Sequence, residues 1–228
     1  DYVLFVNFED FEEEIKEKIS FLKNKKVTFF SGYDCDSLAF EKISGFVKYF
    51  LPIFKKFPNV DIELRTKSTQ MDPLFSMEPI SNCVVAFSLM PTEIAKKVDH
   101  KAPSIEKRIN TISELASMGW KIGLRFDPLI HGENWKILYS NLFEHIFKNI
   151  DKKVLHSITL GPLRFPKDMF KKIISMNPKS KLLSDTLVLR GNKISYSNGI
   201  EQEMQSFCTN LLKDYSAETL FFNCKGNF

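Results

Sequence analysis

The chain alternates short apolar segments with longer segments in which apolar residues recur every three or four positions. The first kind has the length of buried strands, and the second has the pattern of amphipathic helices. The expected strands are Val27–Phe30, Ile62–Thr66, Cys83–Leu89, Ile122–Phe126, Ser157–Leu160 and Thr219–Asn223. Strands separated by helices at this cadence predict a parallel sheet.

The helices between these strands carry recognisable start and stop signals. Ser104 is placed to cap a helix that ends at Gly119, and Pro91-Thr92-Glu93 is a credible helix start. Further helices are expected over Phe11–Leu22, from Asp36 or Ser37 to Pro52, over Trp135–Ile146, over Lys167–Met176 and over Glu201–Asp214. A polar loop is expected at Asp72-Pro73, and Lys181–Val188 with Lys193–Ser197 is expected to form a strand and its hairpin return across Gly191-Asn192.

This order predicts an α/β protein, a barrel or partial barrel with parallel strands, in one domain over residues 1–228. The chain lacks the GxGxxG and GxxxxGK patterns, which disfavours a classical dinucleotide or P-loop site. Because the array opens on a helix and the chain starts without methionine, we expect an amino-terminal truncation that removes a first strand.

Composition narrows the class of protein. No apolar run has the roughly 18–20 residues needed to span a bilayer, so we expect no membrane association. The net charge of +4 is mild, and lysines interleave with glutamates, which is typical of solvated helix faces. The four cysteines form no CxxC pair, which favours a reduced cytoplasmic protein without a metal site of its own. We expect a monomer.

Polar side chains gather where the expected strands end, which is where parallel barrels build active sites. Lys67 follows its strand directly and could bind a carboxylate or phosphate, form a Schiff base, or be a solvated loop lysine. Cys35 could donate a hydrogen atom, act as a nucleophile or fill space. Asp36 and Asp127 could be helix caps, and His100 and His131 are expected to be surface histidines.

An ordered set of segments resembles the spore photoproduct lyase family of radical S-adenosylmethionine (SAM) enzymes, and in particular its lyase-like branch. These segments are Ile62–Ser68 (IELRTKS), Phe87–Pro91 (FSLMP), Ala102–Arg108 (APSIEKR), Gly119–Pro128 (GWKIGLRFDP), Trp135 and Leu160–Phe165 (LGPLRF).

The resemblance implies a partial (β/α)6 TIM-type barrel and an enzyme that reductively cleaves S-adenosylmethionine with a [4Fe–4S] cluster. The resulting 5′-deoxyadenosyl radical abstracts hydrogen from a substrate, which in this family is a thymine lesion in DNA. It implies that Lys67 and Ser88 hold the amino-acid end of S-adenosylmethionine. It also implies an electron donor such as flavodoxin or ferredoxin. The residues expected to contact the substrate are Arg125, Asp127, Arg164 and Tyr196.

The chain departs from the family pattern at three places. The CxxxCxxC cluster loop is absent, so no cluster ligands lie in this chain and the chain as given is expected to be inactive. Tyr33 stands where lesion-repairing members carry a hydrogen-donating cysteine, and Cys35 lies two residues later, so both are candidate catalytic residues. The family's Arg-Tyr substrate contact is Ser195-Tyr196 here, and Met90 stands where relatives commonly have Asn.

Two other functions remain open from the residues alone. The first is an ordinary barrel lyase or aldolase that uses Lys67 as a Schiff-base nucleophile. The second is a non-catalytic barrel that binds nucleic acid through its mildly basic surface.

Overall fold

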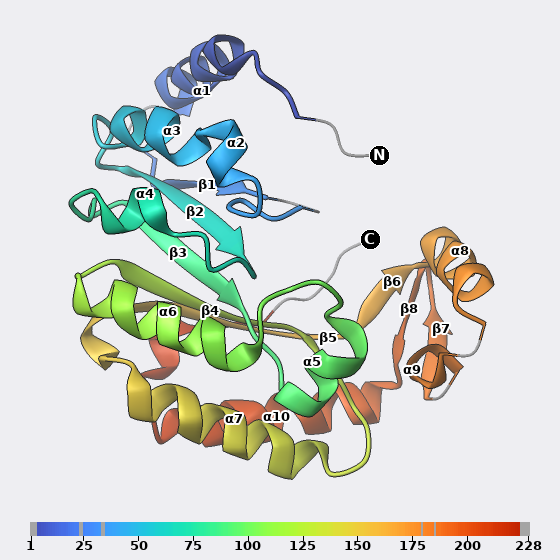
Figure 1. Cartoon of the computed structure of the whole chain (residues 1–228). Coiled ribbons are helices and arrows are strands. Elements are labelled where there is room, and N and C mark those ends of the chain that lie inside the picture. Colours follow the sequence, from blue (N-terminus) through green and yellow to red (C-terminus); the bar gives the residue numbers. More distant parts are fainter. Residues whose placement is uncertain (1–3, 23–24, 33–34, 179, 185, 224–228) are drawn as a thin grey trace.

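A curved sheet of six parallel strands forms the centre of the molecule (Figure 1). The computed structural model describes residues 4–22, 25–32, 35–178, 180–184 and 186–223. In spatial order the strands are β1 (Val27–Ser31), β2 (Val60–Thr66), β3 (Cys83–Ser88), β4 (Lys121–Leu129), β5 (Leu155–Pro162) and β9 (Phe221–Asn223). Every neighbouring pair is parallel. The expected α/β class and the half-barrel of parallel strands are confirmed.

Helices line the outer side of this sheet (Figure 1). They are α1 (Phe8–Leu22), α2 (Glu41–Ser44), α3 (Phe46–Phe54), α4 (Asp72–Phe75), α5 (Thr92–Val98), α6 (Ile105–Ser117), α7 (Trp135–Asn149) and α10 (Asn198–Lys213). Two further helices, α8 (Lys167–Met176) and α9 (Lys181–Ser184), lie beside a second, smaller sheet. Two short 3₁₀ turns, η1 (Lys152–Val154) and η2 (Glu218–Leu220), precede β5 and β9. Helix α3 contacts β2, α6 contacts β4, and α10 contacts β5 and α7. None of the described helices is long and apolar enough to cross a membrane.

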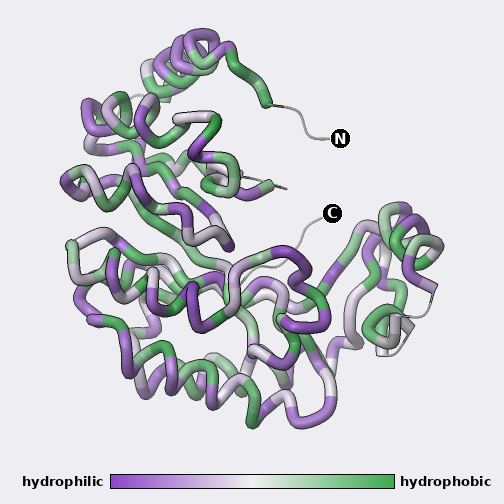
Figure 2. Tube along the Cα trace, in the orientation of Figure 1, coloured by the Kyte–Doolittle hydropathy of each residue, from purple (hydrophilic) through white to green (hydrophobic). Residues whose placement is uncertain are grey.

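The two faces of the sheet differ in polarity because side chains alternate along each strand. One face is apolar, and side chains such as Leu64, Phe87 and Leu124 are fully buried in the core that the helices share. In Figure 2 hydrophobic and hydrophilic residues alternate along the helices that cover the sheet. Burial of each large apolar side chain stabilises the fold by about 1.5–3 kcal/mol.

The other face is the inner wall of the half-barrel, and the strand register places its side chains in rows. Arg65 lies beside Ala86, Ala86 beside Gly123, and Gly123 beside Ser157. Another row joins Ser88 to Arg125. This wall therefore carries polar and small residues, in contrast to the apolar outer face.

A smaller antiparallel sheet lies at one end of the molecule (Figure 1). Its strands, in spatial order, are β6 (Arg164–Pro166), β8 (Lys193–Tyr196) and β7 (Leu187–Arg190). The β7–β8 pair is the hairpin expected across Gly191-Asn192, and its register pairs Arg190 with Lys193. Helix α8 contacts both β6 and β8.

The predicted start of the second helix and the predicted end at Pro52 are wrong. The carboxylate of Asp36 instead caps a turn, and the helical segment is divided at Gly45, which adopts a left-handed φ of 61°. Helix α3 then continues through Pro52 to Phe54. Proline inside a helix costs about 3 kcal/mol, but Ile53 and Phe54 are buried in the core, which offsets that cost.

Three other expectations also differ from the structure. Asp72 and Pro73 open the short helix α4 rather than a loop, with proline near the helix start. Residues 181–184 form helix α9 rather than the beginning of a strand. Strand β4 does not end at Phe126 but runs to Leu129, because Leu129 pairs with Pro162 of β5 after a register shift.

Candidate functional site

The exits of strands β1 and β2 are joined by the carboxylate of Asp36. Its Oδ1 accepts hydrogen bonds from Leu38 N and Ala39 N, both at 2.9 Å, and from the hydroxyl of Thr66 at 2.7 Å. Its Oδ2 accepts from the backbone N–H of Lys67 at 2.6 Å. Asp36 therefore caps a turn rather than the start of a helix, and it also fixes the backbone that carries Lys67.

The two residues expected to hold S-adenosylmethionine are linked through a buried ion-pair network. The ammonium of Lys67 pairs with Oδ1 of Asp99. Oδ2 of Asp99 accepts a hydrogen bond from Nη2 of Arg108 at 2.7 Å, and Nη1 of Arg108 donates to the carbonyl of Ser88 at 2.9 Å. The Lys67 side chain keeps 39% of its surface exposed, whereas Arg108 is 1% exposed. The Lys67 ammonium is thus partly exposed, and the buried Asp99–Arg108 ion pair holds it in position.

The pKa of Asp99 reflects this support. Burial on its own raises the pKa of the carboxyl, but the hydrogen bonds from Lys67 and Arg108 outweigh burial and hold the pKa below its usual value. Asp99 is therefore charged at neutral pH. A Lys67 ammonium that pairs with it has three N–H donors and can still present two of them to an anionic ligand.

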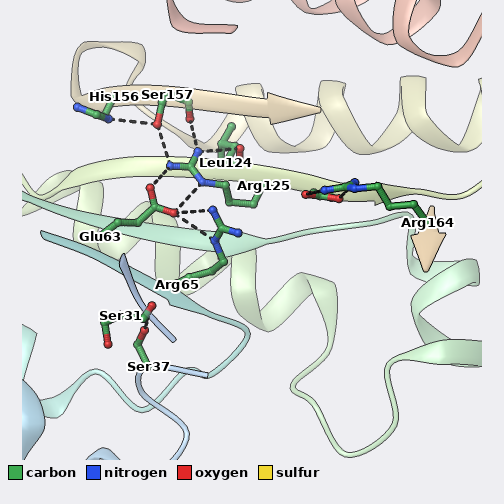
Figure 3. Close-up of polar contacts among 10 residues, drawn as sticks. Ser31, Ser37, Glu63, Arg65, Leu124, Arg125, His156, Ser157 and Arg164 are labelled. Atoms are coloured by element: carbon green, nitrogen blue, oxygen red, sulfur yellow. Dashed lines mark hydrogen bonds and ion pairs between the residues drawn. The ribbon is translucent and has the colours of Figure 1, made fainter. Parts of the chain in front are cut away.

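Arg125 lies within the inner wall, where it is held by Glu63 of strand β2 (Figure 3). Its Nε and Nη2 donate to the two oxygens of Glu63 at 3.1 and 2.7 Å. Its remaining hydrogens reach the carbonyls of Leu124 and Ser157 and the hydroxyl of Ser157, at 3.2, 3.2 and 2.9 Å. All five N–H donors are used and the side chain is 4% exposed. Its expected role in substrate binding stays a prediction.

Glu63 also holds a second arginine. Nε and Nη2 of Arg65 donate to Oε1 of Glu63 at 3.2 and 3.0 Å (Figure 3). Burial raises the pKa of Glu63, but the contacts with Arg125 and Arg65 outweigh burial and lower the pKa. The carboxylate is thus shared between a fully buried cation and a partly exposed one.

Asp127 and Arg164, two of the expected substrate contacts, form a bidentate ion pair. Their oxygen–nitrogen distances are 2.8 and 3.1 Å, and Nη1 of Arg164 also donates to the carbonyl of Pro162 at 3.1 Å. Gly161 lies beneath the pair, where a Cβ would be 2.7 Å from the Asp127 carboxylate. The pair connects β4 to β6 of the small sheet, and its contact with a substrate stays a prediction.

Tyr196 is buried, and its hydroxyl accepts a hydrogen bond from the backbone N–H of His131 at 3.0 Å. The hydroxyl of Tyr139 accepts in the same way from Ile130 N at 2.9 Å. Burial raises the pKa of Tyr196 to about 12, so the phenol is neutral at physiological pH. Two tyrosines therefore hold the loop that follows β4.

The remaining candidates are more dispersed. Cys35 is exposed beyond the end of β1, and Tyr33 lies outside the described residues. His100 is exposed as expected, whereas His131 is half-buried with its ring 5.9 Å from those of Trp135 and Tyr196. The catalytic assignment of Cys35 and Tyr33 stays a prediction.

Sequence reasoning assigned no role to Asp99, Arg108 or Glu63. A charged residue inside the apolar strand segment IELRT is a signal that could have singled out Glu63, because buried charges are rare unless paired. Asp99 gives no such signal in the sequence. Its two partners, Lys67 and Arg108, come from different elements that meet only in the folded chain.

The described residues do not supply the ligands of an iron–sulfur cluster. Cys83 and Cys208 are buried, and burial raises the pKa of both thiols, that of Cys208 to about 12. Within the described part of the chain, no three Cys, His, Asp or Glu side chains gather as a metal site. By contrast, the Lys67 ammonium fits the carboxylate of an amino-acid ligand.

Comparison with known proteins identifies a family. The family model described as Spore photoproduct lyase matches residues 2–214. A spore photoproduct lyase of Clostridium acetobutylicum is 25% identical over 180 residues, which cover 79% of this chain and 53% of the relative. One of Bacillus subtilis is 28% identical over 123 residues, which cover 53% of this chain and 36% of the relative. The chain thus spans about half the length, or less, of these curated relatives.

Solved structures share the fold. A spore photoproduct lyase complexed with dinucleoside spore photoproduct superposes with a TM-score of 0.84 at 16% identity, over 96% of this chain and 67% of that one. A substituted form with bound AdoMet and dinucleoside spore photoproduct has a TM-score of 0.82, at the same identity and coverage. At these identities the likeness establishes a common fold.

Proposed function

The chain belongs to the spore photoproduct lyase family, and on that premise we propose that Lys67 and Ser88 bind the amino-acid end of S-adenosylmethionine. We further propose that the enzyme containing this barrel acts on a thymine lesion in DNA. When bound, S-adenosylmethionine together with a [4Fe–4S] cluster and an electron donor supplies the hydrogen-abstracting radical chemistry. The described residues do not fit the cluster, so no step is assigned to cluster ligands.

The network from Lys67 through Asp99 and Arg108 to Ser88 carries this proposal. It joins the exits of two adjacent strands and holds one ammonium in a fixed, partly exposed position. A carboxylate of the ligand would pair with that ammonium, and the Ser88 hydroxyl would donate a further hydrogen bond. The chain's own contribution is orientation and charge complementarity rather than proton transfer.

The substrate proposal is supported by the relatives, among them a solved spore photoproduct lyase complexed with dinucleoside spore photoproduct. Lys67 is less suited to the alternative of a Schiff-base enzyme. A Schiff-base lysine is activated in a hydrophobic pocket or beside another cation, whereas Lys67 pairs with the carboxylate of Asp99. The structure of the site therefore favours anion binding over covalent catalysis.

Binding of S-adenosylmethionine to the purified chain, measured by isothermal titration calorimetry, tests the proposal. Lys67→Ala is expected to weaken binding by about tenfold or more, because a charge-assisted hydrogen bond contributes about 1.5–3 kcal/mol. Lys171→Ala, on the exposed surface of helix α8, is the matched control and should bind as the wild type does. Failure of the wild type to bind, or equal binding by Lys67→Ala, would contradict the proposal.

A further inference from the structure

The inner wall of the half-barrel carries an exposed aromatic ring on each edge strand of the sheet, Phe30 in β1 and Phe222 in β9. Phe30 lies one residue before the end of strand β1, and 57% of its surface is accessible. The register pairs Phe30 with Glu63, so the ring projects from the same face of the sheet as the Glu63 carboxylate. Phe30 belongs neither to the buried core nor to the residues proposed to bind S-adenosylmethionine.

A guanidinium lies beside this ring. Cζ of Arg65 is 5.9 Å from the centroid of Phe30, a distance typical of a cation–π contact. The Arg65 side chain is 34% exposed. Nε and Nη2 of Arg65 are bound to Glu63, whereas its Nη1 has no hydrogen-bond partner among the described residues. Arg65 thus presents unused donors next to an exposed aromatic face.

The orientation of Arg65 is fixed by buried groups rather than by solvent. Glu63, which accepts from Arg65, is itself held by two hydrogen bonds from the buried Arg125 (Figure 3). A preorganised side chain loses little conformational entropy when it binds a ligand. The Phe30–Arg65 pair, which we call the stacking platform, therefore has the properties of a prepared binding surface.

The platform lies close to the proposed cofactor residues. Arg65 precedes Lys67 by two positions at the end of β2, and two residues of a strand span about 6.6–7 Å. A ligand that stacks on the platform would lie slightly deeper in the barrel than the Lys67 backbone.

We propose that the stacking platform binds one nucleobase of the nucleic acid substrate. The base would stack on the ring of Phe30 and the plane of Arg65, and Nη1 of Arg65, whose N–H bonds lie in that plane, would donate to a neighbouring oxygen of the same nucleic acid strand. Aromatic and guanidinium planes are the surfaces on which proteins stack unpaired bases. This inference rests on the proposed function for the class of substrate, and it adds Phe30 and Arg65 to the residues that recognise it.

Fluorescence anisotropy with a short labelled oligothymidylate, without S-adenosylmethionine, tests the platform. Phe30→Ala is expected to weaken binding by about tenfold, because each stacked base contributes substantially to affinity. Phe30→Trp should retain or strengthen binding. Arg65→Lys keeps the charge but loses the plane, and it should weaken binding by a few fold at least. The effect of Phe30→Ala should persist at raised salt, at which phosphate contacts weaken.

Phe21→Ala is the matched control, because Phe21 is 81% exposed on helix α1, away from the inner wall. Thermal unfolding by circular dichroism checks that each variant is folded. Equal losses for Phe21→Ala and Phe30→Ala, no loss for Phe30→Ala, or no binding by the wild type would overturn the platform. Since no S-adenosylmethionine is present, this outcome is separate from failure of the cofactor proposal, which calorimetry reports.

Discussion

The guanidinium of Arg125 lies across the backbone at Gly123, which leaves no room for a side chain there. A Cβ at Gly123 would be 2.7 Å from Nη2 of Arg125 and 3.0 Å from the Cβ of Ala86. Arg125 could move away only by giving up its hydrogen bonds to Glu63 and Ser157. The glycine in the GWKIGLRF segment is therefore a consequence of the buried ion pair.

Gly123→Ala is accordingly expected to lower the free energy of unfolding by about 1–3 kcal/mol through overpacking. Gly199→Ala is the matched control, because a Cβ at Gly199 meets nothing within 4 Å and alanine favours the helix that contains it. Urea denaturation measures both variants. A Gly123→Ala protein as stable as the wild type would show that Arg125 is not held as described.

Residue chemistry made part of the candidate site predictable. The position of Lys67 and Ser88 at the ends of apolar strand segments was predictable from local spacing, whereas their role as the residues that hold S-adenosylmethionine came from the resemblance to the family. The support of Lys67 was not predictable, because Asp99 and Arg108 come from a helix end and a following helix. Only the folded chain brings these charges together.

The two ends of helix α6 are features of a single element that the sequence predicted correctly. The hydroxyl of Ser104 accepts from Lys107 N at 3.3 Å at the start of α6, and Gly119 follows that helix with a φ of 94°. Ser197 caps α10 in the same way, with its hydroxyl 3.5 Å from Ile200 N, although that helix was expected to begin only near Glu201. Such caps depend on residues within one helical turn, so they can be predicted from the local sequence.

Removal of the α6 cap should have a local and measurable effect. Ser104→Ala is expected to lower the free energy of unfolding by about 1 kcal/mol, because Lys107 N loses its acceptor. Ser104→Asp restores an acceptor and should retain most of the stability. Thermal or urea unfolding distinguishes the two, and an equal loss in both variants would show that the hydroxyl does not act as a cap.

At the scale of the whole molecule, the small sheet is joined to the half-barrel by polar contacts. Glu201 of helix α10 pairs with Arg190 of β7 at 2.5 Å, and its other oxygen lies 2.5 Å from the hydroxyl of Ser195 in β8. The same hydroxyl is 2.7 Å from the carbonyl of Leu163. The Glu201 carboxylate of helix α10 thus orients the β7–β8 hairpin.

Glu201→Ala should therefore loosen the β7–β8 hairpin, with amide exchange there faster by about tenfold, because Arg190 and Ser195 lose a partly buried partner. Glu203→Ala is the control, since the Glu203–Lys136 pair is half-exposed on both sides and contributes little. Hydrogen–deuterium exchange by mass spectrometry reports both. Unchanged hairpin protection in Glu201→Ala would contradict this account.

The sequence by itself determined the kind and order of the main elements, the parallel half-barrel and the strand exits that carry Lys67 and Ser88. These features depend on periodicity and on residues close in the chain, which determine local backbone geometry. Only the tertiary structure decided that α3 continues through Pro52, that Glu63 holds Arg125 and Arg65, and that Asp99 supports Lys67. Those outcomes depend on burial and on charges far apart in sequence, whose distances exist only once the chain has folded.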